Sequence, residues 1–287
     1  MIEGSMDRIK ENIEAWLKED IGTGDVTSIS TIPAEHQSIG YIHAKEMGML
    51  AGLPIAKLVF EIVDPNIIFS EQAVEGSILN KGDTIATVEG NTRNILIGER
   101  LALNLMQRLS GIATKTNQYV KELNNIPVKV VDTRKTTPGH RVLEKYAVKV
   151  GGGFNHRMGL YDAVMIKDNH IKATGSIKKA IEAARNQVPH TMKIEVEIEK
   201  MTEIEEALAA DIILLDNMSI DTLTACVNQI KAKSPHIILE ASGGITLETI
   251  RGVALTGVDV ISVGGLTTSV KNLDISLDLN EKKVIVQ

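Results

Sequence analysis

The segment "MKIEVEIEKMTEIEEALAADIILLDN", which runs from Met192 to Asn217, contains the repeating unit of the fold. Its apolar runs "MKIEVE" and "DIILLD" have the length of buried strands, and the residues between them have the pattern of a helix. Thr202 and Glu205 have the spacing of a capping box, which predicts the start of that helix. Because a helix that joins two neighbouring strands makes them parallel, the segment predicts a βαβ unit.

Six strands of this kind occur from Val128 onward, and helical patterns alternate with them. Near-continuous apolar strands separated by helices indicate a parallel sheet with both faces covered. Their number and spacing favour an α/β fold of the (β/α) barrel type, left incomplete, over a doubly wound sheet. The strands are "VKVVD", "DAVMIK", "MKIEVE", "DIILLD", "HIILEA" and "VDVISV".

The residues before Val128 have a different pattern of predicted helices and strands. An amphipathic helix with Ile9, Ile13, Trp16 and Leu17 on one face precedes the loop "EDIGTGDVTS". Residues 38–95 are rich in short strand patterns, and a helix is expected from about residue 97. The length of 287 residues favours two domains. We expect a β-rich α+β domain at 1–111, an open α/β barrel catalytic domain at 112–271, and a tail at 272–287 that packs on the first domain.

The composition restricts the classes of function. The net charge of -6, the pI of 5.7 and the 3% aromatic content argue against general binding to nucleic acid or anionic membranes. Cys226 is the one cysteine, so no intrachain disulfide is expected, and its helical context predicts a core position. No apolar run approaches the ~20 residues of a membrane span, and the charged N-terminus does not have the pattern of a signal peptide. We expect a cytoplasmic protein.

Polar and charged residues follow the carboxyl end of every predicted strand. These ends meet at one rim of a barrel, where the active sites of this fold lie. An ordinary turn would explain any one cluster, but six in phase, with Lys and Glu among them, indicate a site. The clusters are Asp132-Thr133-Arg134-Lys135, Lys167-Asp168-Asn169, Glu195 with Glu197, Asp216-Asn217, Ser242-Gly243-Gly244 and Gly264-Gly265.

The first cluster lies in a strongly cationic stretch. From Asp132 to Arg157 the chain has six Lys or Arg residues, although the whole chain has a net charge of -6. Two of them, Lys145 and Lys149, are four residues apart and are interpreted as a solvated helix face. Arg134, Lys135 and Arg157 lie instead in loops beside the rim. Guanidinium forks and a lysine charge suit carboxylates or phosphates, so we expect a small polyanionic ligand.

Glycine pairs follow the last two strands, in "LEASGGIT" and "ISVGGLTTS". Bare backbone N–H groups can approach phosphate oxygens there, and loops after the final barrel strands commonly form a phosphate site. The "VGGGFNHR" run lacks G-x-G-x-x-G, so it predicts no dinucleotide site. His156 in that run is interpreted equally well as a neutral hydrogen-bond donor to the ligand or as a loop residue.

Three acidic residues complete the rim. Glu195 and Glu197 point to the same face of one strand, and Asp216 ends the next. Carboxylates that face a phosphate cluster usually hold Mg²⁺ or sugar hydroxyls, whereas a salt bridge to Lys167 or Lys135 is the structural alternative. The chain shows no Ser-His-Asp order and no H-E-x-x-H motif, so no covalent nucleophile is expected.

The combination "DTRKTTPG…EKYAVKVGGGFNHRMGLYDAVMIKDNHI" resembles the quinolinate phosphoribosyltransferases, the carboxylating nicotinate-nucleotide pyrophosphorylases of NAD synthesis. The resemblance spans nearly the whole chain, since "GDVTS", "GERLALNLMQRLSGIAT", "EVE", "LLDN", "EASGGI" and "ISVGGLT" occur in the family's order. It implies a glycosyltransferase that forms nicotinate mononucleotide, pyrophosphate and CO₂ from quinolinate and 5-phosphoribosyl 1-pyrophosphate (PRPP) with Mg²⁺. It also implies a homodimer with shared active sites, open to further assembly.

The matching motifs imply a role for each site residue. The quinolinate carboxylates would be held by Arg134, His156, Arg157 and Lys167, with Arg100 reaching in from the partner subunit. PRPP would be bound by Thr133, Ser242, Gly243, Gly244, Gly264 and Gly265. The catalytic residues would be Lys135, which faces PRPP, and Glu197 and Asp216 at the ribose and Mg²⁺, where Glu197 rather than Glu195 matches the second acid of "EVE". The family commonly has His in the last phosphate loop; this chain has Thr268, which carries no charge.

Two other functions compete with this one. A paralogue of the same fold would transfer phosphoribosyl to another acid, and a non-catalytic protein would bind a phosphate ligand without reaction. The set Arg134, Arg157 and Lys167 favours quinolinate. Transfer of a ribosyl group through an anomeric carbon of oxocarbenium character needs no covalent nucleophile, which agrees with the absence of a nucleophile motif. Positioning of the reactants and cationic groups near the departing pyrophosphate would supply the catalysis.

Overall fold

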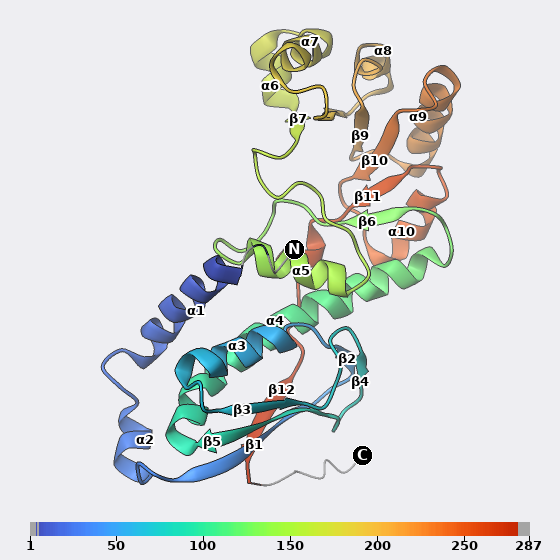
Figure 1. Ribbon diagram of the computed structural model, residues 1–287. Helices are drawn as coiled ribbons and strands as arrows, with labels where there is room; N and C mark the ends of the chain where they lie inside the picture. Colours follow the sequence, from blue (N-terminus) through green and yellow to red (C-terminus); the bar gives the residue numbers. More distant parts are fainter. Residues whose placement is uncertain (1–3, 5, 281–287) are drawn as a thin grey trace. The chain divides into compact units, whose positions relative to one another are not determined.

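Figure 1 shows the computed structural model, which describes residue 4 and residues 6–280. The chain divides into two units, each described by itself below. The first unit contains residues 1–117, 137–152 and 269–287, and the second contains residues 118–136 and 153–268. Residues 281–287 of the tail expected on the first domain lie outside the described residues.

The second unit contains one six-stranded parallel sheet, in the order β6-β11-β10-β9-β8-β7 (Figure 1). Its strands coincide with the six predicted from the sequence. Among the described residues β6 pairs with β11 and β7 with β8, but β6 and β7 do not pair, so the barrel is open between them. The prediction of an incomplete (β/α) barrel is confirmed. The strands are β6 (Lys129–Val131), β7 (Val164–Ile166), β8 (Ile194–Ile198), β9 (Ile212–Asp216), β10 (Ile238–Ser242) and β11 (Val260–Ser262).

Helices connect these strands, and the strand residues that point toward them are apolar. Val196, Ile213 and Leu239 are fully buried, as expected for the outer face of a barrel sheet. Cys226 is also fully buried, which confirms its predicted core position. The helices are α6 (Asp168–Thr174), α7 (Ile177–Gln187), the 3₁₀ turn η2 (Met201–Glu203), α8 (Ile204–Ala207), α9 (Ile220–Lys233), α10 (Leu247–Ala254) and α11 (Gly265–Thr268).

The predicted capping box between Thr202 and Glu205 is wrong. The carboxylate of Glu203 accepts hydrogen bonds from the N–H groups of Glu199 and Lys200, at 2.9 Å and 3.0 Å. The helical turn therefore begins at Met201, one residue before the Thr202 that was expected to cap it. Glu203 rather than Glu205 accepts the free N–H groups, because a carboxylate is stabilised at the start of a helix.

The first unit contains an antiparallel sheet in the order β12-β1-β5-β3 and the small pair β2-β4, so the predicted β-rich α+β character is confirmed. Strand β12 comes from the end of the described chain and pairs with β1. The strands are β1 (Gln37–Ala44), β2 (Gly48–Met49), β3 (Ile68–Glu71), β4 (Ile78–Leu79), β5 (Thr84–Asn91) and β12 (Ile275–Leu279). The helices are α1 (Met6–Ile21), α2 (Val26–Thr31), α3 (Leu53–Val63), α4 (Thr92–Leu123), whose last six residues belong to the second unit, and α5 (Arg141–Val150).

Helix α3 lies in a region whose pattern predicts strands, and its capping explains the difference. Its N-terminus follows Gly52, which has the left-handed φ of 96°. The carboxylate of Glu75 accepts the N–H groups of Gly52 and Leu53 at 2.7 Å and 3.0 Å. The capping group thus comes from a distant part of the chain, where a local pattern does not show it.

Three further local expectations are corrected. Helix α2 occupies the end of the predicted loop, because the Asp25 carboxylate accepts the N–H groups of Thr27 and Ser28, both at 3.0 Å. Helix α4 begins at Thr92 rather than near residue 97. The interpretation of Lys145 as solvated is wrong, since it is fully buried in α5, whereas Lys149 is exposed. The buried arc of α5 is wide enough to include the neighbouring Glu144 as well.

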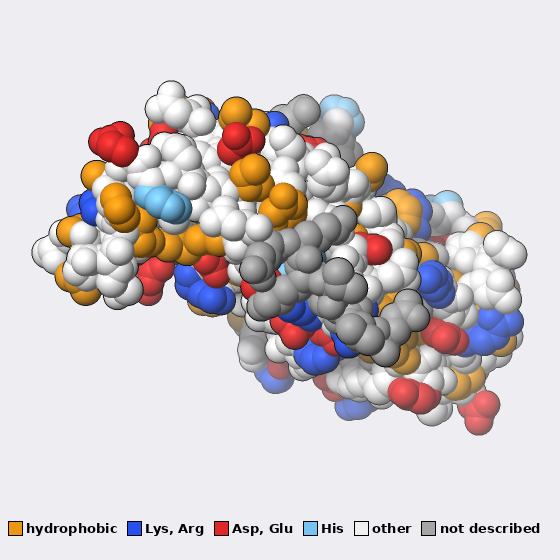
Figure 2. Space-filling model, turned by 90° about the horizontal axis from the view of Figure 1, so that it is seen from below, with side chains coloured by type: hydrophobic (Ala, Val, Ile, Leu, Met, Phe, Trp, Pro, Cys, Tyr) orange, Lys and Arg blue, Asp and Glu red, His pale blue; other side chains and the backbone are white. Residues whose placement is uncertain are grey.

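Acidic and basic side chains are interspersed over the face of the molecule drawn in Figure 2. Within residues 4 and 6–280, no helix combines the length and the apolar character that a membrane crossing requires.

Candidate active site

A cavity of about 760 Å³ lies at the carboxyl ends of the strands of the second unit. Side chains alternate along a strand, so every second residue faces the cavity and those between face the helices. The cavity-facing residues near each strand end are therefore two apart. They include Met165 and Lys167, Leu214 and Asp216, Glu240 and Ser242, and Ser262 and Gly264.

All the site residues predicted from the sequence, except Arg100, line this cavity. Arg100 lies in the first unit, where its side chain is 59% exposed and its Nη2 atom is 3.8 Å from Oε1 of Glu99. Glu195 is buried and does not line the cavity, whereas Glu197 lines it. The residues brought together are Thr133, Arg134, Lys135, His156, Arg157, Lys167, Glu197, Asp216, Ser242, Gly243, Gly244, Gly264 and Gly265.

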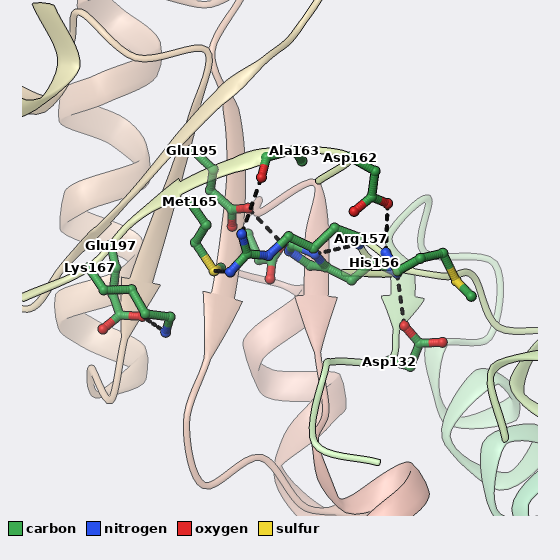
Figure 3. A network of polar contacts seen from close by, with 11 residues as sticks. Asp132, His156, Arg157, Asp162, Ala163, Met165, Lys167, Glu195 and Glu197 are labelled. Carbon is green, nitrogen blue, oxygen red and sulfur yellow. Dashed lines mark hydrogen bonds and ion pairs between the residues drawn. The ribbon is translucent and has the colours of Figure 1, made fainter. Parts of the chain in front are cut away.

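Two arginines carry the positive charge of one wall. Burial and the nearby charge of Arg134 lower the pKa of Arg157 below its ordinary value. The Arg157 guanidinium donates to the carbonyl oxygen of Ala163 at 3.2 Å, and Nη2 is 3.5 Å from Sδ of Met165 (Figure 3). Like charges held together at a partly buried wall repel, so an anionic ligand would be stabilised there.

Lys167 and Glu197 form an ion pair across neighbouring strands (Figure 3). Met165 on β7 lies opposite Glu195 on β8, so Lys167 reaches the level of Glu197 two residues further on. The salt bridge considered as the structural alternative for the acids is therefore present. Because the Lys167 side chain is 44% exposed and lines the cavity, it can also meet a ligand.

The glycine loop after β10 depends on the absence of a side chain. Gly243 has a φ of 94°, and a Cβ atom there would lie 2.1 Å from Oδ1 of Asn217. The N–H of Asn217 donates to the carbonyl of Ser242 at 2.9 Å, and its side-chain amide donates to Asp216 at 2.6 Å. Asp216, Asn217 and the Ser242-Gly243 loop therefore form one tightly packed wall.

The glycine loop after β11 is joined to the loop after β6. A Cβ atom at Gly264 would lie 3.2 Å from Cδ of Lys135. The Thr267 hydroxyl donates to the carbonyl of Lys135 at 2.6 Å, and the hydroxyl of exposed Thr268 donates to the carbonyl of Gly264 at 3.1 Å. The cationic side chain thus lies across the bare glycine backbone, which is the arrangement that a phosphate needs.

The sequence reasoning did not select Glu240, which lines the cavity and is only 4% exposed. With His156 and Glu195 it forms a group whose ligand atoms lie within 4.8 Å of one another. Desolvation, and then the charge of Glu195, raise the pKa of Glu240 to about 7. The signal was available, because Glu240 precedes Ser242 by two residues and must share its face.

Glu197 and Asp216 fit a magnesium ion that is shared with a phosphate ligand. Mg²⁺ in such sites keeps several waters and takes one or two carboxylates together with phosphate oxygens. Glu197 lies opposite Leu214, two residues before Asp216 on the neighbouring strand, and both acids line the cavity. These two carboxylates therefore match the number and kind of protein ligands that Mg²⁺ takes in such sites.

The open parallel barrel has cations, acids and glycine loops at its strand ends, which is typical of (β/α) barrel enzymes that act on phosphate-containing ligands. Comparison with known proteins identifies the family. Residues 25–110 match the model of the quinolinate phosphoribosyl transferase N-terminal domain, and residues 112–278 match that of its C-terminal domain. The chain belongs to the quinolinate phosphoribosyltransferase family.

Similar proteins support this membership over at least 93% of the chain. The chain is 48% identical to the probable carboxylating nicotinate-nucleotide pyrophosphorylase of Bacillus subtilis, covering 95% of this chain and 93% of that protein. It is 47% identical to the Synechocystis protein of the same name, covering 93% and 91%. The crystal structure of NadC from Streptococcus pyogenes matches with a TM-score of 0.90 at 41% identity, covering 98% of both chains. The nicotinate-nucleotide pyrophosphorylase from Francisella tularensis matches with 0.89 at 38% identity, covering 96% of both.

Proposed function

We propose that this protein transfers the phosphoribosyl group of PRPP to the ring nitrogen of quinolinate and releases pyrophosphate, with loss of CO₂ to give nicotinate mononucleotide. The observation that carries the proposal is one cavity with cationic side chains on two of its walls. Arg134, Arg157 and Lys167 lie on one wall, and Lys135 lies across the Gly264 loop on the other. Quinolinate has two carboxylates and PRPP has phosphates at both ends, so the two walls match the two substrates. The names of the similar proteins support the same reaction.

In the first step the cations position the reactants. Arg134, Arg157 and Lys167 would hold the quinolinate carboxylates, so that the ring nitrogen faces the anomeric carbon of PRPP. Ser242, Gly243, Gly244, Gly264 and Gly265, with Thr133 beside them, would bind phosphate through hydroxyl and backbone N–H groups.

Lys135, Glu197 and Asp216 would act where charge changes. As the bond from the anomeric carbon to pyrophosphate breaks, Lys135 would stabilise the growing negative charge on the leaving group. Glu197 and Asp216 would hold the ribose hydroxyls and Mg²⁺, which supplies charge neutralisation to the pyrophosphate when bound. The C–C bond to the adjacent carboxylate then breaks, CO₂ departs, and the electron pair of that bond stays on the ring carbon. The neighbouring positive charge of the pyridinium nitrogen stabilises this carbanion, and a proton then adds to the carbon.

The proposal includes a homodimer with shared sites. In such a dimer the exposed Arg100 of one subunit would enter the cavity of the other and add a further carboxylate contact. An Arg100→Ala variant mixed with an inactive Lys135→Ala variant would then recover about a quarter of the native activity per subunit, whereas each variant alone stays inactive. No recovery on mixing would contradict shared sites.

The reaction itself is tested directly. The protein is incubated with quinolinate, PRPP and Mg²⁺, and nicotinate mononucleotide and CO₂ are measured. Nicotinate in place of quinolinate should give no product, because it lacks one of the two carboxylates that Arg134, Arg157 and Lys167 would hold. Product from another pyridine acid would favour the paralogue, and PRPP binding without CO₂ release would favour the binding protein.

A further inference from the structure

The imidazole of His156 lies between the Arg157 backbone and the buried Glu195 (Figure 3). The carboxylate of a second buried glutamate, Glu240, also lies near the ring. The His156 side chain is 14% exposed, whereas those of Glu195 and Glu240 are 3% and 5% exposed. The family motif implies that this histidine holds a substrate carboxylate. The contacts of the ring point to a different role.

The hydrogen bonds assign the tautomer of the ring. The N–H of Arg157 donates to Nδ1 of His156 at 2.7 Å. A backbone amide can only donate, so Nδ1 accepts and carries no proton, and the ring proton is on Nε2. Nε2 lies 3.2 Å from Oε2 of Glu195 and 3.6 Å from Oε2 of Glu240. The N–H of the ring therefore points at the two glutamates.

An anionic ligand does not suit either ring nitrogen. A carboxylate at Nε2 would lie beside two buried acids, Glu195 and Glu240, and the buried Oε1 atom of each has no hydrogen-bond partner among the described residues. Like charges repel strongly away from water. A carboxylate at Nδ1 would meet an acceptor and would have to displace the Arg157 N–H. The ring is thus suited to hold protein groups rather than the substrate.

The segment that carries the ring also crosses the open side of the barrel. Phe154 forms a parallel bridge with Val131 of β6, and the N–H of His156 donates to Oδ1 of Asp132 at 2.9 Å. Arg157 follows directly and reaches the carbonyl of Ala163, just before β7. Because β6 and β7 do not pair with each other, the direction of Arg157 depends on this segment and on the ring that holds its N–H.

We propose that His156 is a positioning residue, which acts on quinolinate through Arg157 by holding the Arg157 N–H at Nδ1 and the Glu195 and Glu240 carboxylates at Nε2. This inference rests on the proposed function, in which Arg157 binds a quinolinate carboxylate. In this inference Arg157 contacts the quinolinate carboxylate directly, and His156 orients Arg157.

A double-mutant cycle on the full chain tests the inference. The dissociation constant of quinolinate is measured by calorimetry, and the KM values of quinolinate and PRPP by product formation. Arg157→Ala should weaken quinolinate binding by roughly 10–100-fold, since a charge-assisted contact is lost. His156→Ala should weaken it roughly tenfold and leave the KM of PRPP within about twofold. In the Arg157→Ala background, His156→Ala should add less than about a twofold change, because residues that act as one unit are not additive.

Two further variants test the contacts of Nδ1 and Nε2 separately, and each keeps a polar side chain so that misfolding is less of a concern. His156→Gln keeps a donor near Nε2, so the buried glutamates keep a partner, but it lacks the acceptor at the Nδ1 position. His156→Asn places an acceptor at the Nδ1 position. We expect Asn to retain more quinolinate affinity than Gln, and the reverse order would overturn the inference.

The outcomes distinguish this inference from the proposed function. If the His156→Ala and His156→Gln losses are the same with and without Arg157, the histidine contacts the substrate directly and the inference fails. If neither variant changes quinolinate affinity while Arg157→Ala does, the inference also fails and the proposed function stands. If Arg157→Ala itself leaves quinolinate affinity unchanged, the carboxylate clamp of the proposed function is wrong.

Discussion

The side chain of Lys135 lies across Gly264, so close that a Cβ atom on the glycine would be 3.2 Å from Cδ of the lysine. The two residues are 129 positions apart in the chain but follow neighbouring strands, because β6 pairs with β11. The loop after the first strand of the barrel and the loop after the last strand therefore form one site. A phosphate bound at the bare backbone of Gly264 would lie within reach of the lysine charge.

We expect Lys135→Ala to lower kcat by at least roughly 100-fold, because a charge that stabilises departing pyrophosphate is lost. The dissociation constant of quinolinate should stay within about twofold, since Lys135 faces the other wall. Steady-state kinetics and calorimetry measure the two quantities. Lys172→Ala is the matched control, because Lys172 is 71% exposed and pairs with Asp168, and it should leave kcat unchanged. An unchanged kcat in Lys135→Ala would remove the role of this lysine.

Gly243→Ala should raise the KM of PRPP about tenfold or more. Its new Cβ atom would lie 2.1 Å from Oδ1 of Asn217, which would force the wall around Asp216 apart. Gly175→Ala is a close control, because Gly175 has a φ of 93° against 94° for Gly243 but has open space around it. Both changes incur a similar backbone cost of about 1 kcal/mol, so Gly175→Ala measures that cost alone, and the clash with Asn217 adds to it only in Gly243→Ala. Equal KM values for PRPP in the two variants would show that the Gly243 loop does not bind it.

Glu144→Ala should lower the free energy of unfolding by about 3 kcal/mol. The Glu144 carboxylate is 1% exposed and accepts hydrogen bonds from Arg108 at 2.9 Å and from the Thr137 hydroxyl and N–H at 2.9 Å and 3.1 Å. Removing it leaves these donors without their acceptor. Urea unfolding measures the change, and Glu182→Ala in the exposed Lys178–Glu182 pair should cost less than about 0.5 kcal/mol. A similar small loss in both variants would contradict this account of α5.

The stability of the protein should depend on Glu240 between pH 4.5 and pH 7. The pKa of Glu240 is raised from 4.5 to about 7, mainly by burial and then by the charge of Glu195. A raised folded-state pKa means that the native protein binds this proton more tightly than the unfolded chain. The stabilisation is therefore complete below pH 4.5 and is lost as the pH rises through about 7.

Glu240→Gln should remove this dependence. We expect the native protein to lose on the order of 3 kcal/mol more than the variant between pH 4.5 and pH 8. Urea unfolding midpoints of both proteins, measured across this interval, give the difference directly. Parallel curves for the two proteins would mean that Glu240 is ionised at neutral pH in the folded state.

The parallel barrel and most of its site could be predicted from the residues alone. Apolar strands such as "DIILLD" alternate with helices, and parallel strands place their carboxyl ends at one rim, so local order is enough to gather Arg134, Lys167 and Asp216. Pairs two residues apart on one strand also share a face whatever the rest of the fold does. The family motifs added a role for each position, which the experiments above test.

Other features depend on groups that only the folded chain brings together. The capping of α3 by Glu75 and the burial of Lys145 involve residues from other segments, which a helical or strand pattern does not contain. The direction of the His156 ring is set by Glu195 and Glu240 from two other strands. The physical reason is that covalent order determines which way neighbouring side chains alternate, whereas desolvation and cross-strand hydrogen bonding are set by whichever distant groups share the interior.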